Sequence, residues 1–260
     1  MPTPDAAALA AAIEATLRAA GTPERAAQEK RYLRSSLEHL GATVPAIRKA
    51  AAAALLATQA LDHDGLVAVV ELLWARGVFE CRRAAVELLE MNAGRLVAAD
   101  VPLLERLLRD ARTWALVDTL AARVAGPLLM RVRGAGGIID RWARDADFWL
   151  RRSALLLHLM PLREGRGSFE RFARHADAML EDTEFFVRKA IGWVLRDASR
   201  RDPDRVAAWL LPRAARASGV TLREAVKHLP ARRRSAILAA AGGRRSRAAG
   251  RSAARATPAR

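Results

Sequence analysis

Cysteine, aromatic residues and long apolar runs are scarce in this chain of 260 residues. A single cysteine, Cys81, allows no internal disulfide, which is typical of a protein from a reducing compartment. Aromatic residues make up 5% of the chain although 52% is hydrophobic, and much of that is alanine, which favours closely packed helices. No apolar run approaches the ~20 residues that span a bilayer. Asp5 and Glu14 interrupt the apolar N-terminal stretch, so we expect no signal peptide and a cytoplasmic protein.

Positive charge, by contrast, is in excess. The formal net charge is +16, and the segment 242–260 contributes six arginines and no acid, which leaves +10 (16 − 6) for the rest. A charge of this sign favours a polyanionic partner, of which nucleic acid is the commonest. The segment 242–260 lacks apolar periodicity and is predicted to be a disordered, arginine-rich tail after one repeat domain, 1–241.

One short pattern recurs along the chain: an apolar residue, a basic residue, a variable position and a small or apolar run. The variable position falls at Lys49, Arg83, Asp118, Arg152, Lys189 and Glu224, in steps of 34, 35, 34, 37 and 35 residues. A period of this length with two helices per unit predicts an all-α solenoid of about six HEAT-like repeats with a concave basic face. Prolines, glycines and capping residues then place the helices. We expect helices near 5–20, 23–38, 45–59, 63–76, 78–92, 101–110, 113–131, 136–145, 147–160, 168–181, 184–200, 203–216, 220–229 and 231–241.

Equivalent positions of stacked repeats form rows along one surface, and positions four apart on a helix share a face. Four members of the variable row are basic, so this row can either track a phosphate backbone or form a ladder of ion pairs between repeats. Asp118 interrupts the row, as a neutralising acid or as a catalytic carboxylate. Four residues earlier the row is mostly aromatic and includes Trp114; four residues later Trp193 stands out.

Other kinds of site have little support. The five histidines lack metal-ligand spacing and cysteine partners, so we expect no metal or other cofactor. The chain has neither a P-loop nor a dinucleotide-binding glycine fingerprint.

Three segments together resemble the DNA alkylation repair family, the AlkD-like HEAT-repeat DNA glycosylases. The segment 113–118 (TWALVD) is similar to the family's catalytic Trp-x-x-x-Asp stretch, and 149–154 (WLRRSA) to its Trp-Leu-x-Arg segment. The segment 185–196 (FFVRKAIGWVLR) resembles its most recognisable stretch. Weaker similarity at 31–33, 40–41 and 223–228 extends the resemblance over about residues 10–230.

The resemblance implies a monomeric enzyme that hydrolyses the N-glycosidic bond of N3- or N7-alkylated purines in double-stranded DNA, without a membrane partner. It implies catalytic roles for Asp118, Trp114 and Trp193 and phosphate contact for Arg152. The other expected DNA contacts are Arg83, Lys49, Lys189, Arg151 and Arg188. Such an enzyme would be associated with the nucleoid. Two alternatives stay open: a non-catalytic HEAT-repeat binder of branched or distorted DNA, and a HEAT scaffold for a protein partner.

Overall fold

A computed structural model describes residues 6–57 and 61–242. Within these ranges the chain is helical throughout its regular structure, apart from an isolated bridge between Glu38 and Val78, so the predicted all-α fold is confirmed. The chain divides into two compact units, Met1–Ala135 and Gly136–Arg260. The predicted disordered tail, 242–260, lies outside the described residues except for Gly242.

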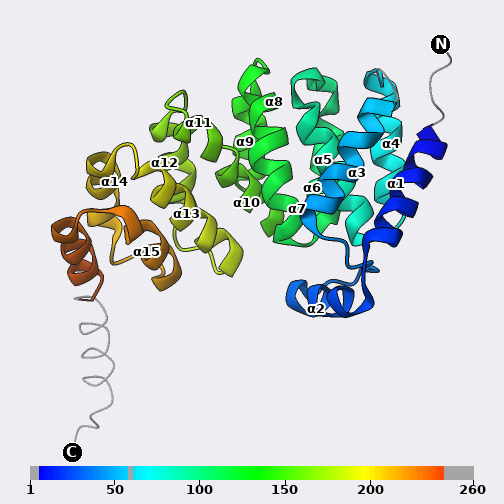
Figure 1. The fold of residues 1–260 in the computed structure, drawn as a ribbon. Helices are drawn as coiled ribbons and strands as arrows, with labels where there is room; N and C mark the ends of the chain where they lie inside the picture. Colours follow the sequence, from blue (N-terminus) through cyan, green and yellow to red (C-terminus); the bar gives the residue numbers. More distant parts are fainter. Residues whose placement is uncertain (1–5, 58–60, 243–260) are drawn as a thin grey trace, which may run out of the picture. The chain divides into compact units, whose positions relative to one another are not determined.

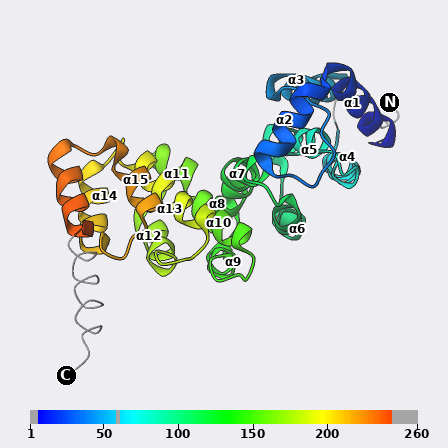
Figure 2. The same cartoon turned by 90° about the horizontal axis from the view of Figure 1, so that it is seen from below.

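The first unit consists of helices that follow one another at short intervals (Figures 1 and 2). These helices are α1 (Ala6–Ala20), α2 (Pro23–Leu33), α3 (Val44–Ala57), α4 (His63–Ala75), α5 (Phe79–Met91), α6 (Val101–Ala111), α7 (Trp114–Thr119) and α8 (Gly126–Arg131). The helix α3 packs on α5 and α5 on α7, so the first three copies of the recurring pattern stack in order. Fully buried leucines such as Leu73, Leu88 and Leu107 fill the space between helices.

The second unit is also built of helices joined by short connections. Its helices are α9 (Ala135–Trp142), α10 (Phe148–Leu156), α11 (Leu159–Arg163), α12 (Phe169–Ala178), α13 (Phe185–Ala198), α14 (Pro203–Leu210), α15 (Gly219–Ala225) and a last helix over 231–242. The helix α10 packs on α13 and α13 on α15, so the last three copies of the pattern stack as well. All six copies therefore lie on helices, as the period predicts.

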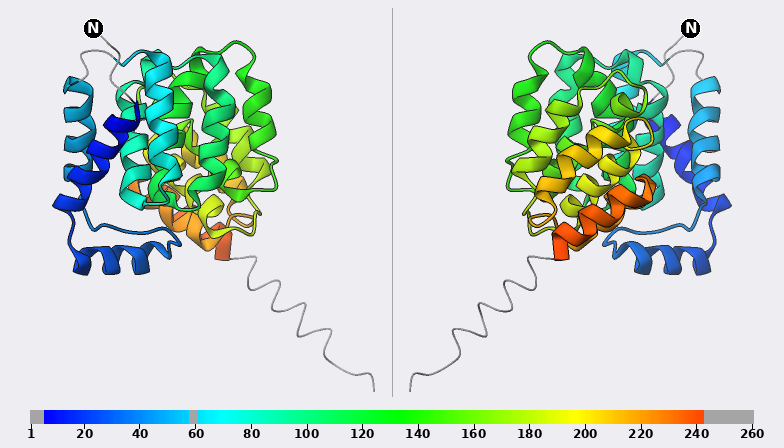
Figure 3. Two further views of the ribbon diagram at one scale, coloured as in Figure 1. Left: turned by 90° about the vertical axis from the view of Figure 1, so that its right-hand side faces the viewer. Right: turned by 90° about the vertical axis from the view of Figure 1, so that its left-hand side faces the viewer.

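The helix α2 departs from its predicted bounds and from the direction of its neighbours. The sequence predicts a helix to residue 38, but α2 ends at Leu33, because Arg34 adopts a left-handed conformation (φ 50°) and closes the last turn with its N–H. The following residues run alongside the start of α5, where Glu38 N–H donates to Gly77 O and Phe79 N–H to Glu38 O (3.1 and 2.9 Å). None of the residues of α2 is buried, and it runs across the ends of the other helices of this unit (Figures 1 and 3).

The helices α7 and α8 are joined by a π-helical turn, Leu120–Ala125. Pro127 gives the physical reason, because a proline inside a helix lacks an N–H and its ring clashes with the carbonyl four residues earlier. The wider turn relieves that clash, and Gly126 N–H donates to Ala121 O, five residues back. Such turns are frequent at functional sites, and this one begins two residues after Asp118.

Candidate functional site

Trp114 and Asp118 lie one turn apart on α7. The chain reaches them through Arg112 in a left-handed conformation (φ 47°), and the Thr113 hydroxyl then caps the helix by accepting from Ala115 N–H (3.4 Å). Trp114 is therefore the first residue of the helix, and the spacing of four puts the indole and the carboxylate on one face. Both side chains are half-buried. The predicted Trp-x-x-x-Asp pair is thus held by a well-capped helix start.

A second aromatic ring meets this pair from α2. The ring of Tyr32 stands edge-on to the indole of Trp114, with centroids 6.0 Å apart and an angle of 90° between planes. Tyr32 is nonetheless 74% exposed, so its ring projects from the surface beside Trp114. No motif of the sequence assigns Tyr32 to the site. Its position as the only tyrosine of the chain, near the end of a mostly polar helix, was the available signal.

Arg83 is held by contacts within the first unit. Its Nε and Nη2 donate to Glu87 Oε1 (3.1 and 2.5 Å), and its Nη1 donates to Ala115 O and Thr119 Oγ1 (2.9 and 3.0 Å). The Glu87 side chain is 1% exposed and also accepts from Arg48 Nε (2.8 Å). These bonds tie α5 to the turn that carries Trp114. They favour the inter-repeat ladder over direct phosphate contact for Arg83.

Arg152, in the second unit, makes the bond that corresponds to that of Arg83. Its Nη1 donates to the carbonyl of Phe186, the second residue of α13, just as Arg83 Nη1 donates to the carbonyl of the second residue of α7. The Arg152 guanidinium also lies 5.8 Å from the centroid of the Phe186 ring, and the residue is 2% exposed. This position of the repeat therefore builds the stack in both units. Phosphate contact by Arg152 stays a prediction.

The remaining basic candidates fall into two groups. Lys49 and Lys189 are exposed, and the Lys189 ammonium lies 5.8 Å from the Phe185 ring centroid. Arg151 donates to Asp182 through Nε (2.7 Å) and to two backbone carbonyls, and Arg188 Nε donates to the carbonyl of Asp182. The two lysines thus have the accessibility that a phosphate contact needs, whereas the two arginines fix the loop before α13.

Aromatic side chains gather where α10 and α13 begin. Phe148 and Trp149 contact Phe186, with ring centroids 6.4 and 5.1 Å away. Phe185, beside Phe186, is 50% exposed. Trp193 lies two turns further along α13 and is half-buried. This unit therefore presents apolar rings together with the exposed Lys189, a combination that suits contact with nucleotides.

Gly192, in the most recognisable segment of the resemblance, has a packing role. A Cβ at this position would lie 2.7 Å from both Glu224 Cβ and Thr221 O on α15. Glycine is thus required by the close approach of α13 and α15. Elsewhere in the described chain, one group of side chains has the donor set of a metal site: Glu29, His39 and Glu80.

These observations define a class: an all-helical repeat protein with a tryptophan–aspartate pair on one repeat helix and a strongly basic composition. The sequence model of the DNA alkylation repair enzyme family matches residues 13–229. The chain belongs to this family. Within the described residues, no helix is both long and apolar enough to cross a membrane.

Solved structures agree on the fold. A predicted DNA alkylation repair enzyme from Enterococcus faecalis is 23% identical, with a TM-score of 0.70 over 81% of this chain and 97% of that one. The smu.31 protein of Streptococcus mutans UA159 is 18% identical (TM-score 0.56; 80% and 98% covered). AlkD2 from Streptococcus mutans is 20% identical (TM-score 0.57; 79% and 99% covered). Among proteins of curated function, none matches the chain.

Proposed function

We propose that this protein is a DNA glycosylase that hydrolyses the N-glycosidic bond of cationic N3- or N7-alkylpurines in duplex DNA. The observation that carries the proposal is the pair Trp114 and Asp118, one turn apart on α7, with the exposed ring of Tyr32 edge-on to the indole. Membership of the DNA alkylation repair enzyme family and the net charge of +16 support it. Such an enzyme would act at the nucleoid.

The proposed reaction needs few catalytic groups. An alkylated purine of this kind carries a positive charge, so the electrons of the breaking C1′–N bond neutralise the base, and no acid has to protonate it. The sugar becomes oxocarbenium-like. Asp118 would stabilise that charge electrostatically and accept the proton of the water that adds to C1′. The products are the free alkylated base and an abasic site.

The aromatic groups would act on the same developing charge. The π face of Trp114 would attract the cationic sugar, a contact worth about 1–2 kcal/mol when water is excluded. We propose the same role for Trp193 and a phosphate contact for Arg152. Lys49 and Lys189, both exposed, would hold the DNA backbone more weakly and less specifically.

The direct test measures release of 7-methylguanine and 3-methyladenine from alkylated duplex DNA. Asp118→Asn should lower the single-turnover rate by 100-fold or more, the order that loss of one electrostatic stabiliser costs, while DNA affinity stays within about threefold. Asp64→Asn is the matched control, because the Asp64 side chain is 98% exposed on α4. Wild-type protein that binds DNA and releases no base would instead support a non-catalytic binder. Full activity in Asp118→Asn would refute the mechanism.

A further inference from the structure

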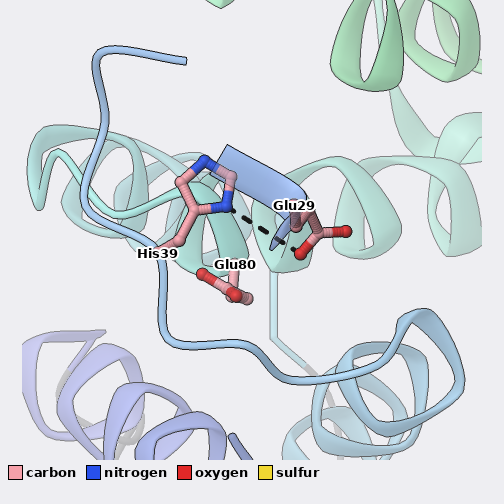
Figure 4. A group of neighbouring side chains, drawn as sticks. All are labelled: Glu29, His39 and Glu80. Atoms are coloured by element: carbon pink, nitrogen blue, oxygen red, sulfur yellow. Dashed lines mark ion pairs between the residues drawn. The ribbon is translucent and has the colours of Figure 1, made fainter. Parts of the chain in front are cut away.

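Three side chains from separate parts of the first unit come together between α2, the loop that follows it and the start of α5. Glu29 comes from α2, His39 from the loop that follows it, and Glu80 from the first turn of α5 (Figure 4). Each can offer one ligand atom, and these atoms lie within 4.8 Å of one another. Two carboxylates and one imidazole thus face a common point, although the residues are far apart in the sequence.

The polar atoms of this cluster are incompletely satisfied. The His39 side chain is 1% exposed, and neither of its ring nitrogens has a hydrogen-bond partner among the residues that the structure describes. Glu29 Oε2 is buried without one as well, and it lies 3.8 Å from His39 Nδ1, beyond hydrogen-bond range. Buried polar atoms are almost always paired, since an unpaired one costs about 1–3 kcal/mol. A histidine with two such nitrogens therefore calls for a partner.

Two of the three groups are already fixed in place. The His39 ring stacks on Phe79, with centroids 4.7 Å apart and an angle of 7° between planes. The Glu80 oxygens accept from Leu40 N–H and Gly41 N–H (2.9 and 2.6 Å), and the residue is fully buried. Backbone N–H groups of this kind orient a carboxylate. The loop and α5 thus form a preorganised half-site, to which α2 adds Glu29.

The charge of the cluster favours a dication. Two carboxylates carry −2 between them, and the cation near Glu29 is Arg25, whose Nη2 lies 3.5 Å from the other oxygen, Oε1. Glu80 is fully buried, and a cation beside a buried carboxylate offsets the cost of removing its charge from water. Imidazole and carboxylate ligands together suit Zn²⁺ and its neighbours among the transition metals, with water completing the coordination. Two ligand atoms on a tetrahedral zinc lie about 3.4 Å apart, so Glu29 and His39 need approach only slightly.

We propose that Glu29, His39 and Glu80 bind a divalent transition-metal ion of the Zn²⁺ type, which fastens α2 to the start of α5. The helix α2 has no buried residue to hold it by apolar packing. It also carries Tyr32, which contacts Trp114. The ion is structural, and its consequence is the placement of Tyr32. The proposal does not depend on the glycosylase reaction, because the binding is measured without DNA.

The test uses the full chain, stripped with EDTA and dialysed into metal-free buffer. Isothermal titration with Zn²⁺ should give one site per chain, and hydrogen exchange followed by mass spectrometry should show slower amide exchange in α2 when zinc is present. Glu29→Gln should weaken zinc binding at least tenfold and abolish the protection of α2. We expect this variant to fold like the wild type, because α2 has no buried residue in the core.

Two controls make the result specific. Glu24→Gln removes an exposed acid of the same helix, and His63→Gln removes the histidine that pairs with Asp64 and Asp100 (both 3.0 Å). Both should bind zinc as the wild type does. The proposal is overturned if wild-type protein shows no saturable zinc binding, which would leave an ordered water as the partner of His39. It is also overturned if Glu29→Gln binds like the wild type or if His63→Gln alone loses the site.

Discussion

Arg83 and Glu87 lie one turn apart on α5 and form an ion pair that solvent scarcely reaches, with side chains 12% and 1% exposed. Removing one partner of a buried pair leaves an uncompensated charge, which is costly. We expect Arg83→Gln to lower the free energy of unfolding by about 2 kcal/mol. This loss is smaller than that for a buried pair with no further partner, because Arg48 still contacts Glu87. Urea denaturation measures this. The double variant Arg83→Gln/Glu87→Gln should be less destabilised than the sum of the two single variants.

Lys49, in the preceding repeat, should behave in the opposite way. Its side chain is exposed, so Lys49→Gln should change the free energy of unfolding by less than about 0.5 kcal/mol. It should weaken binding to any duplex and reduce the dependence of log K on log salt concentration by about one unit, because one phosphate contact is lost. Fluorescence anisotropy at several salt concentrations checks this. An unchanged salt dependence would remove Lys49 from the interface.

Substitution of Tyr32 tests whether its ring, which contacts Trp114, contributes to the reaction. Because Tyr32 is 74% exposed, Tyr32→Ala should leave stability nearly unchanged. Removing the ring that contacts the Trp114 indole should misplace the indole and lower the single-turnover rate of base release by about 3- to 10-fold, the equivalent of about 0.7–1.4 kcal/mol. Tyr32→Phe keeps the ring and should retain full activity. Equal activity of all three proteins would show that this ring takes no part in the reaction.

The sequence predicts the repeats well and the contacts between them poorly. The six pattern copies lie on packed helices because a period of apolar positions directly encodes which face is buried. Arg83 pairs with Glu87, which stands four residues later and is visible in the sequence. The low exposure of the Arg83 side chain depends on its packing against α7, which the sequence does not show. The course of the loop after α2 is fixed by backbone bonds of Glu38 to Gly77 and Phe79, which no local pattern reveals.

The two sites differ in the same respect. Trp114 and Asp118 are local, so a motif of five residues finds them, whereas Tyr32 is brought to Trp114 only by the fold. The cluster of Glu29, His39 and Glu80 is more distant still, and its members have no regular spacing. The spacing of the histidines therefore predicts no metal site. Functional residues that lie close together in the sequence can be predicted from such a chain, whereas those that the fold brings together from different helices cannot.

Gly192 and Gly137 provide a matched pair of glycine substitutions. A Cβ at Gly192 would clash with backbone and side-chain atoms of α15 at 2.7 Å, so Gly192→Ala should lower the free energy of unfolding by about 1–3 kcal/mol. Apart from its own helix, no described atom lies within 4 Å of a Cβ at Gly137, which is exposed on α9. Gly137→Ala should therefore raise the stability by about 0.5–1 kcal/mol. Thermal and urea unfolding measure both. A stable Gly192→Ala variant would mean that α13 and α15 are not tightly packed.

His158 should make the stability of the second unit depend on pH. The His158 ring contacts residues of α12, and its Nε2 lies 3.3 Å from His175 Nδ1. The other ring nitrogen of His175, Nε2, pairs with Asp140 (2.7 Å). Burial, followed by repulsion from His175 and Arg171, lowers the pKa of His158 to about 3. The unfolded chain therefore binds a proton between about pH 6.5 and 3 that the folded chain does not, so stability falls as the pH falls through this window.

From pH 8 to pH 5 this histidine alone should remove about 2 kcal/mol from the free energy of unfolding. His158→Gln has no group to titrate and should lose correspondingly less stability over the same range, even if it is less stable than the wild type at pH 8. His228→Gln, which replaces an exposed histidine, should follow the wild type. Urea denaturation at half-unit pH steps gives the three profiles. Parallel profiles for wild type and His158→Gln would show that His158 becomes protonated in the folded protein without cost.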